Sequence, residues 1–505
     1  MDIRPHLIGA ICAFFLAAPA INAQEAYVQG PSDRYEWPSD PLVLEKLDAW
    51  QDLKFGILIH WGLYSVPGIV ESWNLCNEDW VVRPEGSTYE GYKQWYWGLA
   101  KDFNPVAFNP GQWVEVAVRC GMKYVIFTTK HHDGYCLFDS SYTDFSIAKG
   151  PFGRDAAAEV FDAFRAAGLM TGAYFSKPDW HCSGFWNPYY ATPDRHPNYN
   201  IEKHPDWWQS YVEYTRRQIG ELTSGRYGKL DILWLDGGWI PGDAVGLDDL
   251  LVDARKVSPG LISVDRTIAG PNENYQTPER MVPEYQIDHP WESCMPLSDD
   301  WGWTPDARYK SARTVINTLV EITAKGGSLV LGVGPTGDGV VERREEEILE
   351  QIGDWLALNG EAVYGTRITP RYHDGNIWFT ASRDGRTLYA HCPKGKNCLP
   401  RSPGKAISLR ENSRSFPPDA DSGQASKTAG LPSASPRVCL PPPSRSNSQS
   451  AEALPLPRIR CTELSVLQLF THFACIIFHA GKIRKLQSDG HLNATVKNKT
   501  CKSAK

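Results

Sequence analysis

The chain has 505 residues, of which 42% are hydrophobic and 22% are charged, enough for one large core and a smaller region beside it. Its formal net charge of -7 argues against a nucleic-acid or anionic-membrane partner, because either would call for a basic stripe or a basic excess. The 19 Trp and 22 Tyr exceed the needs of such a core, and aromatic rings with a polar handle are suited to stacking on sugar faces. We leave a homo-oligomer open.

The first 23 residues are typical of a secretory signal peptide. Arg4 and His6 precede an apolar run over residues 7–16, and a small-residue region ends at Ala23. The apolar run is too short to cross a bilayer of ~30 Å as a helix. We therefore expect export, to the periplasm or exterior of a bacterium or to the lysosome or exterior of an animal cell.

Strand-like apolar runs alternate with helix-like stretches over residues 24–366. The predicted strands are 54–62, 122–132, 169–176, 230–238, 261–266 and 326–335, and the predicted helices are 156–168, 205–224, 247–257, 306–327 and 341–360. Nearly continuous apolar strands with helices between them indicate a parallel sheet covered on both faces. Either a barrel or a doubly wound sheet fits this pattern.

Polar, aromatic or charged residues follow most of these strands. They are His60-Trp61, Lys130 to Asp133, Ser176, Asp236 and Asp265-Arg266. A (β/α)8 barrel assembles its site from the carboxyl ends of many strands, whereas a doubly wound sheet concentrates its site at one switch point. We therefore predict an α/β fold with a (β/α)8-like catalytic barrel. The glycine-rich stretch 332–339 has no following Lys and is interpreted as a turn.

The pattern changes after residue 366. Residues 367–398 are expected to begin a small β domain, with a hairpin over 377–392 that has Asp384-Gly385 in its turn. Residues 399–505 are low in complexity and are expected to form a disordered or aberrant tail. The apolar stretch 464–481 is interrupted by polar residues, so a membrane helix there is the minority interpretation.

The stretch LDILWLDGGW (230–239) begins as a buried strand and ends on a carboxylate. The two glycines after Asp236 leave room for a ligand, and Trp234 and Trp239 can form pocket walls. A helix-capping role is less favoured, because helix signals do not begin until about Asp243. Glycoside hydrolysis uses a pair of carboxylates, so a second acid is expected.

Candidates for the second acid lie in the loop-rich stretch 270–294: Glu273, Glu279, Glu284, Asp288 and Glu292. Glu279 follows Thr277-Pro278 in a loop from which it can reach a departing sugar. Glu292 sits beside Trp291, where desolvation by the ring would raise its pKa. Spacing along the chain does not choose between them.

Three histidines, His60, His131 and His132, follow two of the predicted strands. Their imidazoles can hydrogen-bond vicinal sugar hydroxyls, and metal ligation is the rival interpretation. Adjacent residues on a strand point to opposite faces, so we do not expect His131 and His132 to chelate one ion together. The five cysteines in the predicted barrel show no zinc-like spacing and no evident disulfide framework.

Seven motifs in this order resemble glycoside hydrolase family 29, the α-L-fucosidases, over about residues 45–395. They are KFGILIHWGLYSVPG (54–68), MKYVIFTTKHHDGYCLFDS (122–140), LDILWLDGGW (230–239), VDR (264–266), YQTPER (275–280), PWESC with WGW (290–303) and GGSLVLGVGPTGDG (326–339). Members usually end in a β-sandwich, whereas residues 399–505 lack regularly spaced strands. A truncated or altered C-terminal region is therefore expected.

The resemblance implies an exo-acting retaining hydrolase of terminal α-L-fucosides on oligosaccharides or glycoproteins, without metal or cofactor. Asp236 matches the nucleophile and Glu279 the acid/base, with Glu292 in reserve. Other matched pocket positions are His60, His131, His132, Tyr174, Trp234, Arg266, Glu71 and Trp73, the last two separated by Ser72. A barrel glycosidase for another sugar and an inactive carbohydrate-binding relative remain the alternatives.

Overall fold

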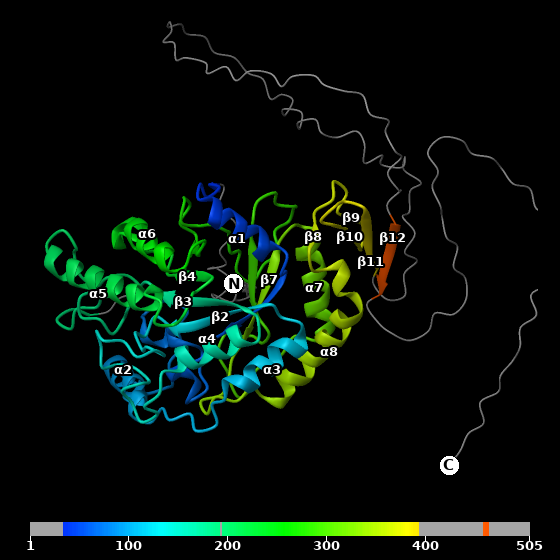
Figure 1. Cartoon of the computed structure of the whole chain (residues 1–505). Coiled ribbons are helices and arrows are strands. Elements are labelled where there is room, and N and C mark those ends of the chain that lie inside the picture. The colour runs from blue at the N-terminus through cyan, green and yellow to red at the C-terminus, as the bar shows by residue number, and fades with distance from the viewer. Residues whose placement is uncertain (1–33, 192–193, 393–457, 464–505) are drawn as a thin grey trace, which may run out of the picture. The chain divides into compact units, whose positions relative to one another are not determined.

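The computed structural model describes residues 34–191, 194–392 and 458–463. Seven parallel strands lie in the order β5-β4-β3-β2-β1-β7-β6. They are β1 (Phe55–Ile59), β2 (Tyr124–Lys130), β3 (Met170–Ser176), β4 (Ile232–Asp236), β5 (Ile262–Asp265), β6 (Glu292–Pro296) and β7 (Ser328–Val333). This curled sheet confirms the predicted (β/α)8-like barrel (Figure 1).

An irregular segment, residues 272–280, fills the place between β5 and β6. It makes an antiparallel bridge from Glu273 to Val264 of β5 and a parallel bridge from Glu279 to Cys294 of β6. Backbone hydrogen bonds support both sides, for example from the Asn274 amide to the Ser263 carbonyl at 2.9 Å. The segment therefore places Glu279 beside Cys294, the middle residue of β6.

Helices surround the sheet (Figure 1). They are α1 (Pro41–Gln51), α2 (Tyr89–Gly98), α3 (Pro110–Cys120), α4 (Ala156–Ala166), α5 (Pro205–Thr223), α6 (Leu247–Val257), α7 (Ala312–Ala324) and α8 (Arg343–Asn359). α4 begins after Asp155, whose side chain accepts from the Ala158 amide. α7 begins after Ser311, which caps the Thr314 amide, so this helix starts later than the predicted residue 306.

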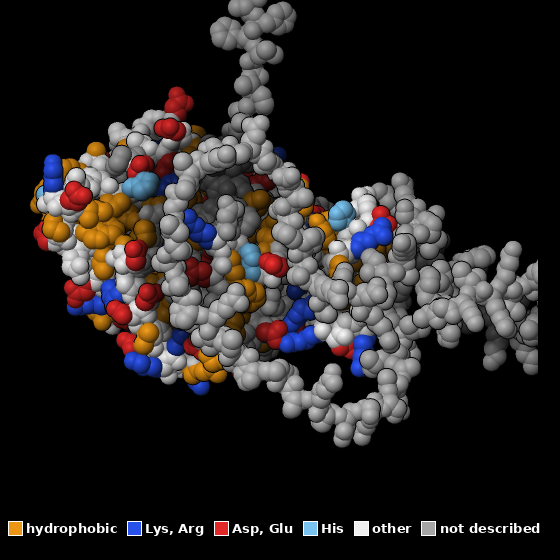
Figure 2. Space-filling view, turned by 90° about the horizontal axis from the view of Figure 1, so that it is seen from above, with side chains coloured by type: hydrophobic (Ala, Val, Ile, Leu, Met, Phe, Trp, Pro, Cys, Tyr) orange, Lys and Arg blue, Asp and Glu red, His pale blue; other side chains and the backbone are white. Residues whose placement is uncertain are grey.

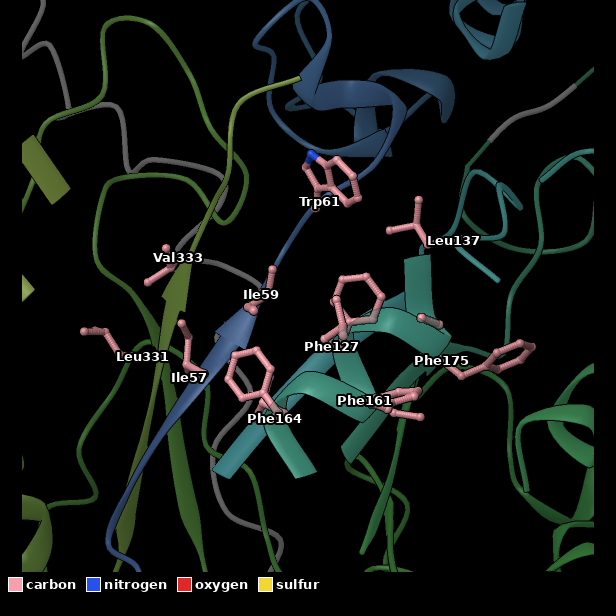
Figure 3. Close-up of a cluster of buried hydrophobic side chains, with 14 of the residues drawn as sticks. Ile57, Ile59, Trp61, Phe127, Leu137, Phe161, Phe164, Phe175, Leu331 and Val333 are labelled. Atoms are coloured by element: carbon pink, nitrogen blue, oxygen red, sulfur yellow. The ribbon is translucent and has the colours of Figure 1, made fainter. Parts of the chain in front are cut away.

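Side chains along each strand alternate between two cores, as the two-residue period requires. Ile57 and Ile59 of β1 pack outward with Phe127 of β2 and Phe161 of α4 (Figure 3). Leu58, between the two isoleucines, belongs to the cluster inside the barrel, whose members also include Tyr124, Ile126, Tyr174, Ile232, Trp234, Ile262, Val264, Cys294 and Val330. Inward-pointing residues at the strand ends therefore line the barrel mouth.

All six predicted barrel strands are present, and β6 is the barrel strand that was not predicted from the sequence. Its residues, ESCMP, include an acid, a serine and a proline, which are untypical of a buried strand. β6 falls at the end of the stretch 270–294 that was interpreted as loop-rich. Pairing with β7 from Glu292 to Pro296 gives these residues their strand conformation.

A small sheet follows the barrel: β8 (Thr366–Arg367), β9 (His373–Asp374), β10 (Ile377–Ser382) and β11 (Thr387–Cys392). β10 and β11 pair antiparallel, and Gly385 adopts a φ of 68° between them, so the predicted hairpin is confirmed. Strand β12 (Arg458–Glu463) pairs parallel with β11, within residues 399–505, which were expected to lack regularly spaced strands. The predicted leader and the stretch 464–481 lie outside the described residues.

Four charged residues join the small sheet to the C-terminal end of α1. Arg367 pairs with Asp48 at 2.9 Å, and Arg383 pairs with Asp52 at 2.7 Å. Each arginine also contacts the other aspartate. The start of the small sheet is therefore tied to the barrel by ion pairs between residues that lie 319 and 331 positions apart in the chain.

On the face shown in Figure 2, Lys and Arg side chains are interspersed with acidic and hydrophobic ones. Among the helices of the described residues, none combines the length and the apolar character needed to span a membrane.

Candidate active site

A pocket opens at the carboxyl end of the barrel strands. Asp236 lies two residues after Trp234, and Arg266 two residues after Val264, so both continue the inward-facing rows of β4 and β5. The predicted residues that line it are His60, Glu71, Trp73, His131, His132, Tyr174, Trp234, Asp236, Trp239, Arg266 and Glu279. Eleven predicted residues from distant parts of the chain thus meet in one place.

Arg266 joins the two candidate carboxylates. Its Nη1 donates to Oδ1 of Asp236 at 2.7 Å, and its Nη2 donates to Oε2 of Glu279 at 2.8 Å. Nε of the same guanidinium donates to the hydroxyl of Thr277 at 3.1 Å, and Cζ lies 4.4 Å from the ring centroid of Trp234. One rigid planar group therefore sets the relative positions of both acids.

Asp236 is held ionised by its surroundings. Burial on its own would raise the pKa of this carboxyl, but Arg266, His132 and the hydroxyl of Tyr174 hold that pKa well below its usual value. Tyr174 donates to Oδ2 at 2.6 Å, and Nε2 of His132 lies 3.7 Å from the same oxygen. The chain turns sharply after this residue, with a φ of 86° at Gly237. Asp236 is therefore an ionised candidate nucleophile whose carboxylate faces the pocket.

The histidines lie beyond the strand ends. β2 ends at Lys130, so His131 and His132 are not strand neighbours, and both line the pocket with ring centroids 4.3 Å apart. The expectation that they face opposite sides was wrong for this reason. Burial lowers the pKa of His131 to about 4, and it also holds the pKa of His60 and the pKa of His132 well below the usual value. Neutral imidazoles can both donate to and accept from hydroxyls.

Serine hydroxyls orient two of these rings. Oγ of Ser72 lies 2.5 Å from Nδ1 of His131, and Ser176 bonds Nδ1 of His132. The third ring, that of His60, stacks on the ring of Trp301 with centroids 5.1 Å apart. Nε2 of His131 and His132 is thereby left to face the pocket.

Glu71 and Trp73 both line the pocket although Ser72 separates them. Ser72 begins a 3₁₀ turn, η3 (Ser72–Leu75), which lets all three side chains contribute to the site. Oε1 of Glu71 accepts from the amides of Trp301 and Gly302 at 2.6 and 2.8 Å, and burial raises its pKa to about 7.

Glu292 lies beneath the pocket and is not among the residues that line it. It is fully buried, and its carboxyl accepts from the hydroxyl of Tyr124 at 2.6 Å and from Nε1 of Trp234 at 3.3 Å. Burial raises its pKa to about 7, in the direction expected from the sequence. The rise in this pKa comes from burial of the carboxyl in the barrel interior as a whole, rather than from the neighbouring Trp291 alone.

Five lining residues were not anticipated: Leu58, Trp80, Arg195, Arg280 and Trp301. Arg195 lies in a long loop after β3, where its guanidinium pairs with Glu78 at 2.6 Å between the rings of Trp73 and Trp239. Nothing local in the sequence marks this loop as part of the site. Arg280, by contrast, directly follows Glu279 and was open to prediction from that neighbour.

In the described part of the chain, no group of three His, Cys, Asp or Glu side chains is placed to hold a metal ion. The five cysteines of the barrel, Cys76, Cys120, Cys136, Cys182 and Cys294, are free thiols.

Comparison with known proteins agrees with this geometry. The family model described as alpha-L-fucosidase matches residues 22–361. The plasma alpha-L-fucosidase of Rattus norvegicus is 31% identical over 369 residues, which cover 68% of this chain and 77% of the relative.

Solved structures show the same likeness. Alpha-L-fucosidase isoenzyme 1 from Paenibacillus thiaminolyticus is 30% identical with a TM-score of 0.58, covering 69% of this chain and 83% of that one. A Bacteroides thetaiotaomicron alpha-L-fucosidase, solved as a trapped covalent intermediate with 2-fluoro-fucosyl fluoride, is 25% identical with a TM-score of 0.57, covering 70% and 83%. The chain described here belongs to the alpha-L-fucosidase family.

Proposed function

We propose that the pocket at the barrel mouth is where this α-L-fucosidase cleaves terminal α-L-fucose from fucosylated glycans, with Asp236 as nucleophile and Glu279 as acid/base. The observation that carries the assignment is the Arg266 guanidinium, which bonds one oxygen of each carboxylate. Because both carboxylates bond the same guanidinium, they lie close together. A short separation is what a retaining mechanism requires, and in retaining glycosidases the two carboxyl groups are typically ~5–5.5 Å apart.

In the first step an oxygen of Asp236 attacks the anomeric carbon of fucose. The bond to the leaving oxygen breaks, and that oxygen takes the proton of Glu279, so the aglycone departs as an alcohol. In the second step water attacks the same carbon, Glu279 takes the proton of the water, and the bond to Asp236 breaks. Two inversions give α-L-fucose and restore both carboxyl groups.

The remaining polar groups bind and orient the sugar. His60, His131 and His132 present neutral ring nitrogens, which suit hydroxyl groups. Trp73 and Trp301 add aromatic walls, which suit the apolar face and the methyl group of fucose. A methyl contact discriminates by only ~1–3 kcal/mol, so the hydroxyl contacts carry most of the sugar specificity.

Rescue with azide tests the two roles separately. D236A removes the nucleophile, so added azide should enter from the opposite face of an aryl α-L-fucoside and give the β-fucosyl azide. E279A keeps the nucleophile, so azide should intercept the fucosyl-enzyme and give the α-azide. The assignment fails if both variants give the same anomer, or if E292A shows the rescue pattern that is expected of E279A.

We further propose that the chain is exported. Support comes from the order of a basic start, a short apolar run and small residues over residues 1–23. Expression in the native host, cell fractionation and sequencing of the mature amino terminus test this. A cytosolic protein that keeps its first 23 residues would contradict it.

A further inference from the structure

Arg280 directly follows Glu279 and also lines the pocket. Consecutive residues of an extended segment point in opposite directions, but Arg280 has a φ of 55°, a conformation that non-glycine residues rarely adopt. Its amide donates to the Cys294 carbonyl at 2.8 Å, which holds this conformation against β6. The strained backbone thus lets two neighbouring charged side chains share one pocket.

The guanidinium of Arg280 is only partly satisfied. Nη1 donates to the carbonyl of Asp299 at 2.8 Å, and Cζ lies 5.4 Å from the ring centroid of Trp301. Nη2 is buried and has no hydrogen-bond partner among the described residues. A buried donor without an acceptor is costly, so this nitrogen marks a place where a ligand oxygen is favoured.

The side chain of Arg280 is more exposed than those of Asp236 and Arg266, which places it on the outer side of the pocket. The side chains of Glu279 and Arg280 are 20% and 21% exposed. Those of Asp236 and Arg266 are 13% and 4% exposed, so this pair lies deeper. A terminal sugar attacked by Asp236 occupies the deep part, and its leaving group extends outward past the acid that protonates it.

We propose that Arg280 binds the leaving group, with Nη2 donating to an oxygen of the sugar to which fucose is attached. The inference rests on the proposed function, because it takes Glu279 as the acid that contacts the glycosidic oxygen. Arg280 is then a specificity-determining residue that favours sugar leaving groups over apolar ones. The ligand class is a neutral glycan residue with a hydroxyl or ring oxygen near the fucosidic bond.

Kinetics of the full-length chain with two substrates test this. Phenyl α-L-fucoside has a leaving group without further oxygens, whereas an α-L-fucosyl-galactose disaccharide has several. We expect R280Q to lower the ratio of kcat/KM for the disaccharide to kcat/KM for the phenyl fucoside about tenfold, the usual effect of losing one hydrogen bond from a charged donor. An unchanged ratio would overturn the proposal.

Arg308 provides the matched control. It pairs with the side chain of Asp299 at 2.7 Å and is 86% exposed, whereas Arg280 bonds the carbonyl of that residue. R308Q therefore disturbs the same loop without removing a pocket group, and its ratio should equal that of the wild type. A fall as large as that of R280Q would assign the effect to the loop and contradict a contact from Arg280.

Binding separates this inference from the proposed function. Calorimetry on D236A, which turns over neither ligand, compares the disaccharide with methyl α-L-fucoside, with and without R280Q in the same chain. We expect R280Q to weaken the disaccharide at least about fivefold more than the methyl fucoside. Equal weakening of both ligands would overturn the role of Arg280, whereas a wild type inactive on every fucoside would overturn the catalytic assignment alone.

Discussion

The hydroxyl of Tyr174 donates to Oδ2 of Asp236 at 2.6 Å, from the neighbouring strand β3. Tyr174 is fully buried, and burial raises its own pKa well above the usual value, so its hydroxyl stays protonated and donates to Asp236 at neutral pH. The contact favours the ionised form of Asp236 and fixes the direction of its lone pairs.

Y174F should therefore lower kcat/KM for an aryl α-L-fucoside about tenfold. Because Tyr174 helps to depress the pKa of Asp236, its loss should raise that pKa. The acidic limb of the kcat/KM profile, where the nucleophile becomes protonated, should then move to higher pH. A profile of unchanged shape would show that Tyr174 does not tune the nucleophile.

Arg266 should not tolerate replacement by Lys. An ammonium keeps the charge but cannot bond Asp236 and Glu279 through two coplanar nitrogens. We expect R266K to lower kcat/KM for an aryl α-L-fucoside roughly 10- to 100-fold. R308K, at an exposed ion pair, is the control and should differ from the wild type by less than about twofold. R266K kinetics equal to those of R308K would contradict the role of the fork.

Glu292 should make stability depend on pH. Its pKa is raised from 4.5 to about 7 in the folded chain, so the folded state keeps a proton that the unfolded state releases between these values. Its contribution to stability is thus complete below about pH 4.5 and declines as the pH rises to about 7.

The amide that replaces the carboxyl in E292Q does not titrate. The free energy of unfolding of E292Q minus that of the wild type should therefore increase between pH 5 and pH 8, by at most about 3 kcal/mol, because only the wild type loses stability over this range. Urea unfolding of both proteins at the two pH values measures the change. A difference that does not vary with pH would show that Glu292 titrates as in the unfolded chain.

Phe127 should be among the costly core positions. It is completely buried on the outer side of β2, with its ring centroid 6.1 Å from that of Phe161 (Figure 3). F127A should lower the free energy of unfolding by about 3–5 kcal/mol. V118A, at a half-exposed position of α3, is the control and should change it by no more than about 0.5 kcal/mol. Equal effects in urea unfolding would contradict the packing described.

Much of the barrel could be predicted from the sequence because its signals are local. Apolar runs predicted β1 to β5 and β7. The two-residue period along β4 places Asp236 on the same inward-facing side of the strand as Trp234. β6 could not be predicted, since the acid and the proline in it take strand conformation only by pairing with β7.

The sequence by itself determined that an acid follows a buried strand at Asp236 and that a second acid lies within residues 270–294. Only the tertiary structure decided which of those acids reaches the pocket. Glu279 pairs with Cys294, two residues further along β6 than Glu292. That difference in height puts Glu279 at the mouth and Glu292 under Trp234, because depth in a barrel depends on register between segments and not on distance along the chain.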